Sequence, residues 1–537
     1  MDVADRIGGP EAVGDEPDPV GQETADVTRY LAAAAYLDER FMGEVIAQTL
    51  YEKYRFIAPS YGVNIGCVVR HCIASRRLSR RRDFILAALL VVGLWALHLP
   101  LLFEVGVFVV ALLVATALNS RKTKLRWRVV LSIVAYIGIA AFALHPLSLL
   151  TALAAWFVVA ADRYERRYRV VARHMNADAF RAEAPAYGRK RPAQRASDER
   201  RIAHLAGHQD GNVVVYSGYS PFKGSGFRMR RWSWSFAIDV TEAPGDADQS
   251  SPVAPIETND VYAHVIGAMK NLDIKGRSVT ERFYVNGKYA GRDRELFFHP
   301  KGRYERFPKL RTTIDDLAAL EAKPEEMVRR YADIKVASWQ SELMLSAFVR
   351  FSRTADYLFI EVSYHVLPPL KPWYYAINGL NPRPTPHELF RLAVDSLTQM
   401  PLLWLRAPVR VEKWLTRPIA LARWEQQVAQ AIRENRRFDY GARGSIRESG
   451  GDDDYAKYFQ EVDIERLHKI IDRHLLTSIR RFLEGKGVDI SELERSIRVI
   501  INKGIWISGN QSGNMAVDHS QIDIDYSGEA DGAGSSS

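Results

Sequence analysis

Two long apolar blocks, Phe84–Leu118 and Val129–Ala161, constrain this chain more than any other feature. A single helix of about 34 residues would be about 50 Å long, whereas about 20 residues cross the hydrocarbon of a bilayer. Each block is interrupted near its middle, by His98-Leu99-Pro100 and by His145-Pro146. Proline and ionisable groups are unfavourable at the centre of a helix in lipid. We therefore expect residues 83–162 to form two transmembrane hairpins, with up to four short helices.

Arginine-rich clusters flank both blocks, at residues 76–82, 121–128 and 163–173. Short loops rich in Lys and Arg stay on the cytoplasmic side, so hairpins that fully span or re-enter would place all three clusters there. The pattern predicts a multi-pass protein of the inner (plasma) membrane, with both termini cytoplasmic and anionic headgroups as partners of the basic flanks. The alternative is a pair of buried core helices, but such helices usually keep a polar stripe.

Composition limits the remaining choices. The chain has 537 residues, a net charge of +9 and two cysteines, too few for a disulfide framework. Because the basic excess is explained by the flanks, nucleic acid is an unlikely partner. Cys67 and His71 share a helix face, but a structural zinc site needs four ligands. We expect no metal and no cofactor.

Hydrophobic periodicity divides the rest of the chain. The N-terminal part contains a disordered acidic lead and a cytoplasmic amphipathic helix with its basic flank, at 1–26 and 27–82. A basic helix and linker follow the hairpins, and then a cytoplasmic α+β domain, at 163–204 and 205–430. The C-terminal part contains a linker, amphipathic helices and a Gly/Asn-rich strand-like segment with a disordered tail, at 431–455, 456–500 and 501–537.

Alternating apolar residues predict strands in the α+β domain. They lie at 212–216, 227–240, 343–351 and 357–366, with an Asn-Gly hairpin at 283–289. Helices are expected at 324–334, 386–405, 421–436 and 463–483. Strands grouped apart from helices favour a mainly antiparallel sheet.

The loop 217–226 and the strand after it form the most distinctive local sequence. Three glycines and several hydroxyls could present backbone N–H groups to an anion, with basic side chains nearby. The candidate ligand-binding residues are Ser220, Lys223, Ser225, Arg228, Arg230 and Trp232. Alternation would place the arginines and tryptophans of 228–236 on one face. The structural alternative is an aromatic strand packed in the core.

A second candidate is the alternating set Glu361, Ser363 and His365. These side chains share one strand face, close enough to interact. The simpler alternative is the wet side of a half-buried strand. Weaker candidates are His208, Asp210, Asp239, Asp523 and Asp525. Because no catalytic motif is present, the catalytic residues are unknown and enzymatic activity is uncertain.

Residues 463–483 carry the cleanest helical stripe in the chain, including Ile464, Leu467, Ile471 and Leu475. Such a stripe packs either within the chain or against a protein partner, including a second copy. Both alternatives remain open at this point.

Three short segments carry a family resemblance: 58–62, 217–222 and 501–517. The first two resemble uncharacterised multi-pass membrane proteins of actinobacterial type. The third is similar to Gly/Asn-rich terminal segments of some bacterial conflict and signalling proteins. The resemblance implies no activity and transfers no catalytic residue.

The leading functional hypothesis is a membrane-anchored protein whose cytoplasmic domain binds a ligand or partner, as a sensor, scaffold or regulator. The alternative is a membrane-tethered hydrolase or nucleotide-processing enzyme that uses the 217–230 segment. A transporter is a third hypothesis, but the apolar blocks contain few ionisable groups for a transport pathway.

Overall fold

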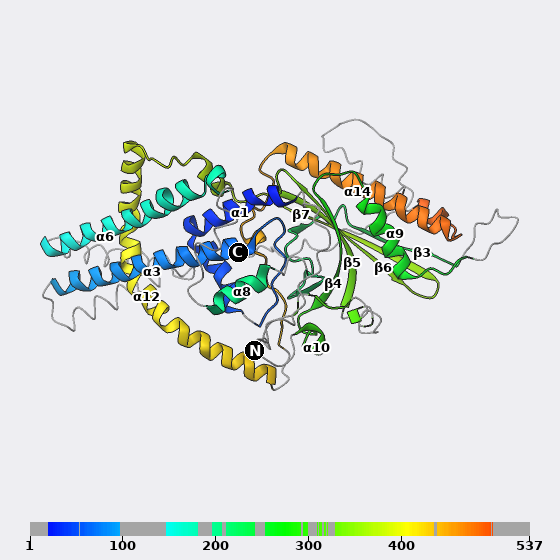
Figure 1. Cartoon of the computed structure of the whole chain (residues 1–537), viewed down its shortest axis with the longest axis horizontal. Helices are drawn as coiled ribbons and strands as arrows, with labels where there is room; N and C mark the ends of the chain where they lie inside the picture. Colours follow the sequence, from blue (N-terminus) through cyan, green and yellow to red (C-terminus); the bar gives the residue numbers. More distant parts are fainter. Residues whose placement is uncertain are drawn as a thin grey trace, which may run out of the picture.

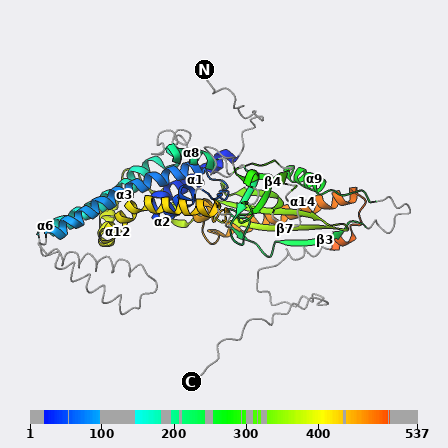
Figure 2. The ribbon, with the colours of Figure 1, turned by 90° about the horizontal axis from the view of Figure 1, so that it is seen from below.

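The computed structural model describes residues 20–52, 54–96, 146–180, 196–206, 211–241, 253–291, 294–298, 311–313, 328–433 and 438–495, with single positions between them. Most helices lie at one end of this structure, and the strands lie at the other end together with α9 and α14 (Figure 1). The helices α3 and α6 project away from the sheet at one end, and Figure 2 shows the same separation from a second direction.

The helical part begins with α1 (Val20–Leu37), which presents almost completely buried alanines to its neighbours. Asp38 ends this helix and caps the next, because its carboxylate accepts the backbone N–H groups of Arg40 and Phe41. The other elements of this part are α2 (Glu39–Ile46), η1 (Ala47–Tyr51), α3 (Ile65–Ala96), α6 (Pro146–Tyr164), η2 (Glu165–Ala172), α8 (Ala196–Ala206), η4 (Pro372–Gly379), α12 (Pro386–Arg433) and α13 (Ile446–Ser449).

The 48-residue helix α12 replaces the two separate helices expected at 386–405 and 421–436. Pro401, Pro408 and Pro418 lie inside it. Each proline removes a backbone donor and bends a helix without having to end it when neighbouring helices support the segment. The helix is strongly curved in Figure 1 and packs on both α3 and α6.

The described strands form one curved, mixed sheet in the order β1, β4, β5, β6, β7, β2, with β3 also paired to β7. Their bounds are β1 (Val213–Tyr216), β2 (Phe227–Arg228), β3 (Trp234–Asp239), β4 (Arg277–Asn286), β5 (Val328–Ser338), β6 (Leu343–Arg353) and β7 (Tyr357–Leu367). β1 lies parallel to β4, and the other pairings are antiparallel. The sheet resembles half a barrel in Figure 1.

Two expected elements are wrong. Residues 324–334 were expected to be helical, yet from Val328 they form β5, because the alternate side chains Ala332, Ile334 and Val336 are buried on one sheet face. Asn286-Gly287 ends β4 without starting a hairpin, and β4 pairs with β5 instead. A Cβ on Gly287 would lie 2.1 Å from the backbone nitrogen of Gly441, so close packing explains this glycine.

One face of the sheet is covered by α9 (Thr258–Lys270) and α14 (Tyr458–Gly485). The regular stripe of α14, including Ile464, Ile471, Leu475 and Ile479, is buried in the same core as strands β5 to β7. The stripe expected at 463–483 is therefore used within the chain. A short helix, α10 (Arg294–Phe297), belongs to a smaller core beside β1 and β4.

The expected membrane hairpins are wrong. Among the described residues, no helix combines the length and the apolar character that a bilayer crossing requires. In α3 the apolar stretch starts only at Phe84, after a run of arginines, and in α6 it ends before Asp162. Within the described residues the stretches are 84–96 and 146–161, and each is shorter than the about 20 residues needed to span. The first turn, at 98–100, and most of both blocks lie outside the described residues, and Pro146 is the first residue of α6.

The other assignments that depended on those hairpins are also wrong. The membrane and transmembrane classification, the multi-pass placement in the inner membrane and the orientation of the termini are therefore corrected. The fold observed in the described residues is a curved mixed sheet joined to a helical part.

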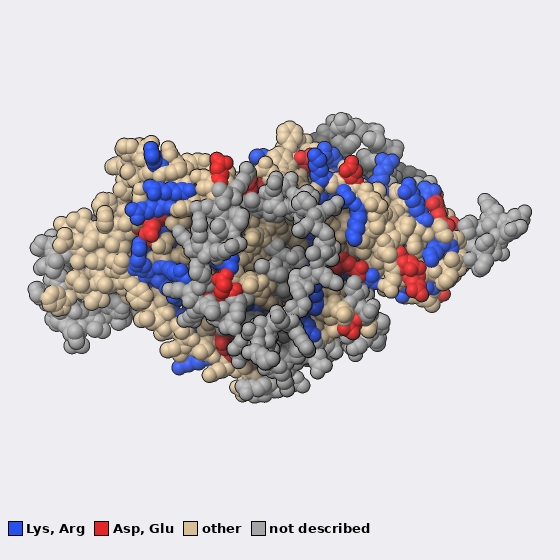
Figure 3. Space-filling view, in the orientation of Figure 1, with Lys and Arg blue, Asp and Glu red and all other residues tan. Residues whose placement is uncertain are grey.

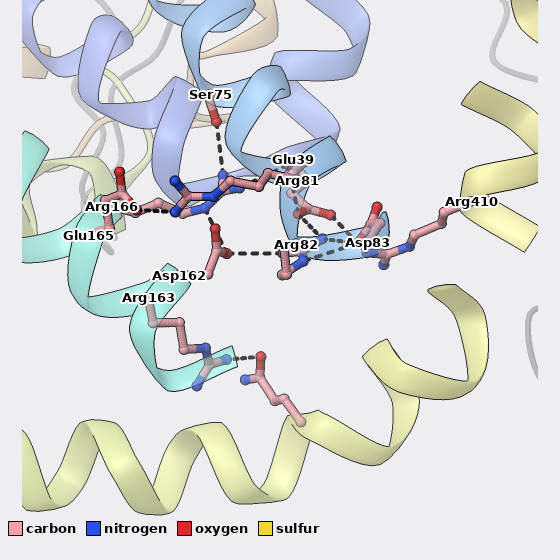
Figure 4. A network of polar contacts seen from close by, with 12 residues as sticks. Glu39, Ser75, Arg81, Arg82, Asp83, Asp162, Arg163, Glu165, Arg166 and Arg410 are labelled. Carbon is pink, nitrogen blue, oxygen red and sulfur yellow. Dashed lines mark hydrogen bonds and ion pairs between the residues drawn. The ribbon is translucent and has the colours of Figure 1, made fainter. Parts of the chain in front are cut away.

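An ion network with a buried centre, which we call the arm network, fixes α3 and α6 to the rest of the helical part (Figure 4). Arg82 lies at its centre and contacts Asp83 at 2.8 Å, Glu39 at 2.9 Å and Asp162 at 3.3 Å. Two further cations complete it. Arg166 contacts Asp162 at 2.9 Å, and Arg410 contacts Asp83 at 3.4 Å.

Nearly every charge of the arm network has a partner. Arg166 also donates hydrogen bonds to the hydroxyls of Ser75 and Ser79, at 2.9 and 3.0 Å. Burial tends to raise the pKa of Glu39, but Arg82 and Arg410 more than offset it, and the pKa is lowered. Burial dominates at Asp162 and raises its pKa. Three cations and three carboxylates thus balance each other's charge and join α3 and α6 to α2 and α12; we refer to this contact as the joint.

Candidate functional site

The sheet face opposite α9 and α14 carries polar side chains where a core face would be apolar. We call it the polar face. Strand register brings its residues together, because directly paired residues point to the same side. Lys335 on β5 lies opposite Ser346 on β6, which lies opposite His365 on β7. The polar face consists of Arg282, Tyr284, Tyr331, Asp333, Lys335, Ser346, Phe348, Arg350, Glu361, Ser363 and His365.

Asp333 is the centre of the polar face and is fully buried. One of its carboxylate oxygens, Oδ2, is crowded. It accepts hydrogen bonds from Lys335 Nζ at 2.7 Å and from the Tyr284 hydroxyl at 2.8 Å, and Arg282 Nε lies 3.7 Å away. The other oxygen, Oδ1, has no hydrogen-bond partner among the residues that the structure describes. The carboxylate is therefore paired on one side only.

A hydroxyl and an imidazole extend this cluster across the sheet. Ser346 is fully buried, and within the described ranges its Oγ makes no hydrogen bond. Next to it, the Ser363 hydroxyl lies 3.3 Å from His365 Nε2. Burial lowers the pKa of His365 to about 4, although the backbone of Gly226 acts in the opposite direction. His365 is therefore neutral at physiological pH.

The loop 217–226 covers the polar face with an aromatic side chain. Phe222 stacks on Phe348, with ring centroids 3.9 Å apart, and meets Tyr284, Tyr331 and His365 edge-on. A second aromatic residue, Tyr61, accepts a hydrogen bond from Arg282 and lies under the Lys335 ammonium. Aromatic side chains therefore cover the charged residues of the polar face.

A carboxylate of the chain itself holds this loop. Glu448 Oε1 accepts the backbone N–H groups of Gly224 at 2.7 Å and Gly226 at 3.0 Å. Gly226 has φ +82°, and a Cβ there would lie 2.0 Å from the carbonyl oxygen of Val366. Only glycine fits this position. These two N–H groups, which the sequence suggested for an external anion, are already paired with Glu448.

The six residues proposed from the loop are spread over different places. Ser225 is buried within the loop, and Ser220 and Lys223 are half-buried. Arg228 and Arg230 are exposed. Trp232 stacks on His468 of α14, with ring centroids 4.5 Å apart. The expected common face of 228–236 does not form, because residues 229–233 turn between β2 and β3, with Trp232 N–H bonded to the Met229 carbonyl.

The second set fits the structure better. Glu361, Ser363 and His365 all lie on the polar face, but the expected wet strand side is wrong, since Ser363 and His365 are buried. Of the weaker candidates, Asp239 caps its own turn by accepting from Thr241. Residues 208, 210, 523 and 525 lie outside the described residues.

Sequence reasoning missed the centre of the site, namely Arg282, Tyr284, Asp333, Lys335 and Ser346. A usable signal exists in β5, where Tyr331, Asp333 and Lys335 alternate with apolar residues. The helix expected over 324–334 concealed it. Once β5 is assigned to a helix, its hairpin pairing with β6 and its pairing with the more distant β4 are lost, so the register across the sheet is not readable from β7 alone.

A second titratable pair, His468 and Asp472, lies between α14 and β7 but belongs to the core. Asp472 accepts hydrogen bonds from Tyr364 at 2.8 Å and Trp234 at 2.9 Å. Burial raises the pKa of Asp472 to about 6 and lowers that of His468 to about 4.

No group of three or more potential metal ligands occurs in the ranges that the structure describes. Cys67 and Cys72 are free thiols there, and burial raises the pKa of both. The imidazole of His71 contacts the Tyr36 hydroxyl at 3.2 Å.

Comparison with known proteins gives one match. A family model described as an AbeC-like domain matches residues 233–516, which is more than half of the chain and includes β3 to β7, α9, α12 and α14. No curated protein and no solved structure matches significantly. Every polar-face residue lies inside the matched range, whereas the covering loop precedes it. The chain belongs to the family that carries the AbeC-like domain.

Proposed function

We propose that the sheet domain is a regulatory binding module whose polar face takes a small ligand. One observation carries the proposal: two completely buried acceptors, Asp333 Oδ1 and Ser346 Oγ, lie on neighbouring strands and have no hydrogen bond within the described residues. Leaving a buried polar atom unpaired costs about 1 to 3 kcal/mol. Native structures therefore pair such atoms with protein, ordered water or ligand.

The charges of the polar face indicate the ligand class. Lys335 and Arg282 are both buried, and they share a single carboxylate oxygen of Asp333. The Lys335 ammonium therefore offers a positive group, and Asp333 Oδ1 offers an acceptor, side by side in a site of low dielectric. An anionic group of a ligand would pair with Lys335, and an N–H or O–H donor on the same ligand would pair with Asp333 Oδ1. Small metabolites that combine both groups are the proposed class.

A hydrolase remains the second candidate because of one contact, the Ser363 hydroxyl 3.3 Å from His365 Nε2. A neutral histidine next to a hydroxyl is the geometry of nucleophile activation. In the described residues no carboxylate is hydrogen-bonded to His365 as an orienting third group. Hydrolysis of p-nitrophenyl acetate that disappears in Ser363→Ala would favour the enzyme. Activity that is equal in the two proteins would exclude this pair.

The binding proposal is tested by thermal unfolding of the full chain with a ligand panel. The panel contains dicarboxylates, amino acids and nucleoside monophosphates, each with its uncharged analogue. A ligand present at about 100 times its Kd stabilises the folded state by about 2.7 kcal/mol. We expect a rise in Tm with at least one anionic class and none with its analogue.

Matched variants then assign the effect to the polar face. Lys335→Met should abolish the ligand-induced rise in Tm, whereas Lys275→Met, at an exposed lysine outside the polar face, should leave it intact. Ser346→Ala should weaken binding without loss of folding. A panel without any stabilising member, or an equal response of the two lysine variants, would contradict the proposal.

A further inference from the structure

The projecting ends of α3 and α6 form an apolar surface, which we call the arm tip. On α3 the exposed residues recur at helical spacing, with Phe84 43 % and Val91 62 % exposed. On α6 they recur in the same way, with Leu153 52 % and Phe157 67 % exposed. Residues 84–96 and 146–161 contain no charged side chain.

The exposed surface is a separate face of a well-packed unit. The opposite sides of the two helices are buried, since Leu86 and Leu90 of α3 pack with Ala155 and Val159 of α6 and with Trp404 of α12. The Trp404 indole also donates a hydrogen bond to the Leu86 carbonyl at 3.0 Å. The arm therefore has its own core, and its outer apolar face is left over for another contact.

A basic belt borders the arm tip. Arg81 precedes the apolar stretch of α3, and Arg163, Arg167 and Arg169 follow that of α6. The Arg81 side chain is 62 % exposed. Figure 3 shows Lys and Arg gathered in a band between the tan, described part of this end and the body of the molecule. The uncharged segments 84–96 and 146–161 next to a belt of cations match an acyl layer next to anionic headgroups.

We propose that the arm tip docks on a lipid surface rich in anionic headgroups, with its apolar side chains in the near leaflet and its basic belt at the headgroups. Charge complementarity selects this occupant. A second copy of the chain would bring two identical basic belts together, and the belts would repel each other.

Vesicle sedimentation of the full chain tests the proposal. One vesicle type is pure phosphatidylcholine, and the other is an equal mixture of phosphatidylcholine and phosphatidylserine. We expect binding to the mixed vesicles, weaker binding to the neutral ones, and loss of the difference at high salt. Absence of binding to the mixed vesicles would overturn the proposal.

Two aromatic residues of equal exposure give a matched control. Phe157→Ser at the arm tip should lower the bound fraction about tenfold, because a buried apolar side chain is removed from the acyl layer. Phe459→Ser on α14, where the phenylalanine is 68 % exposed, should not change it. The double variant Arg81→Gln/Arg167→Gln should abolish the preference for the anionic vesicles. Equal binding of the two phenylalanine variants would contradict the proposal.

Sedimentation equilibrium of the same proteins tests the alternative that the arm tip binds a second copy of the chain. The wild-type chain should show one mass that is not altered by Phe157→Ser. A dimer that dissociates in Phe157→Ser would assign the arm tip to a second copy and overturn the lipid proposal.

Discussion

The arm network and the polar face both bury charges, but only one of them pairs its groups fully. In the arm network three arginines meet three carboxylates, and two serines accept from Arg166. On the polar face two cations share one oxygen of Asp333, while the other oxygen and Ser346 Oγ have no partner in the described residues. Fully paired charges stabilise a contact between helices, whereas buried acceptors without a hydrogen bond indicate a binding site.

Breaking the joint should give the largest effect. Arg82→Met leaves Asp83, which is 1 % exposed, short of its closest cation, so the free energy of unfolding should fall by about 3 to 5 kcal/mol. Arg81→Met, at the exposed neighbour paired with Glu165, should cost less than about 1 kcal/mol. Urea unfolding followed by tryptophan fluorescence compares the two. Equal losses would mean that the network is not a joint.

The second prediction is that acid lowers the stability of the polar face at a higher pH than that of the arm network. Burial lowers the pKa of His365 to about 4 in the folded chain, whereas the ordinary value of 6.5 applies in the unfolded chain. As the pH falls, the unfolded chain therefore binds a proton at this residue before the folded chain does. Stability therefore falls as pH drops from 6.5 to 4, by about 3 kcal/mol for this residue. The lowered pKa of Glu39 removes stability from the arm network only below about 4.5.

His365→Gln isolates that contribution. The difference in unfolding free energy between wild type and variant should depend on pH between 6.5 and 4 and stay constant above 7. His468 and Asp472 titrate in the same window in opposite directions, but both remain in the variant and cancel in the difference. Hydrogen exchange should show β7 opening before α3 at pH 5. A difference that is flat with pH would refute the assignment.

Two fully buried serines provide the finest comparison. Ser75 accepts a hydrogen bond from Arg166, so Ser75→Ala should cost about 1.5 to 3 kcal/mol. Ser346 has no such bond in the described residues, so Ser346→Ala should leave stability unchanged or raise it. Chemical denaturation of both variants measures this contrast. A loss at Ser346 as large as that at Ser75 would show that its hydroxyl is paired within the fold.

Strands with regular alternation were predictable from the sequence. The expected segments 212–216, 343–351 and 357–366 coincide closely with β1, β6 and β7, and the stripe at 463–483 lies inside α14. These elements are specified by local apolar spacing. The strand β5 was missed because Pro324-Glu325-Glu326 is typical of a helix start, while burial of Ile334 and Val336 against α9 and α14 decides otherwise.

The site was predictable only in part, and the predicted membrane hairpins are wrong. The common face of Glu361, Ser363 and His365 is predictable because side chains alternate between the two faces along a single strand. Asp333 and Lys335 join them through the register of β5 on β6 and of β6 on β7, which is lost when β5 is expected to be a helix. The apolar blocks were interpreted as spans, but in the described residues their ends pack with α12 into a short arm. A hydropathy pattern gives no information on such a partner helix.

Ligand titration of the two serine variants tests the contrast most directly. The probe is the anionic metabolite that gives the largest rise in Tm, and the measurement is its Kd by isothermal titration with wild type, Ser346→Ala and Ser75→Ala at a temperature where all are folded. We expect Ser346→Ala to keep its stability and to bind about fivefold or more weakly, through one lost hydrogen bond. Ser75→Ala should lose stability and keep its Kd. Equal affinity of Ser346→Ala and wild type would contradict a ligand site on the polar face.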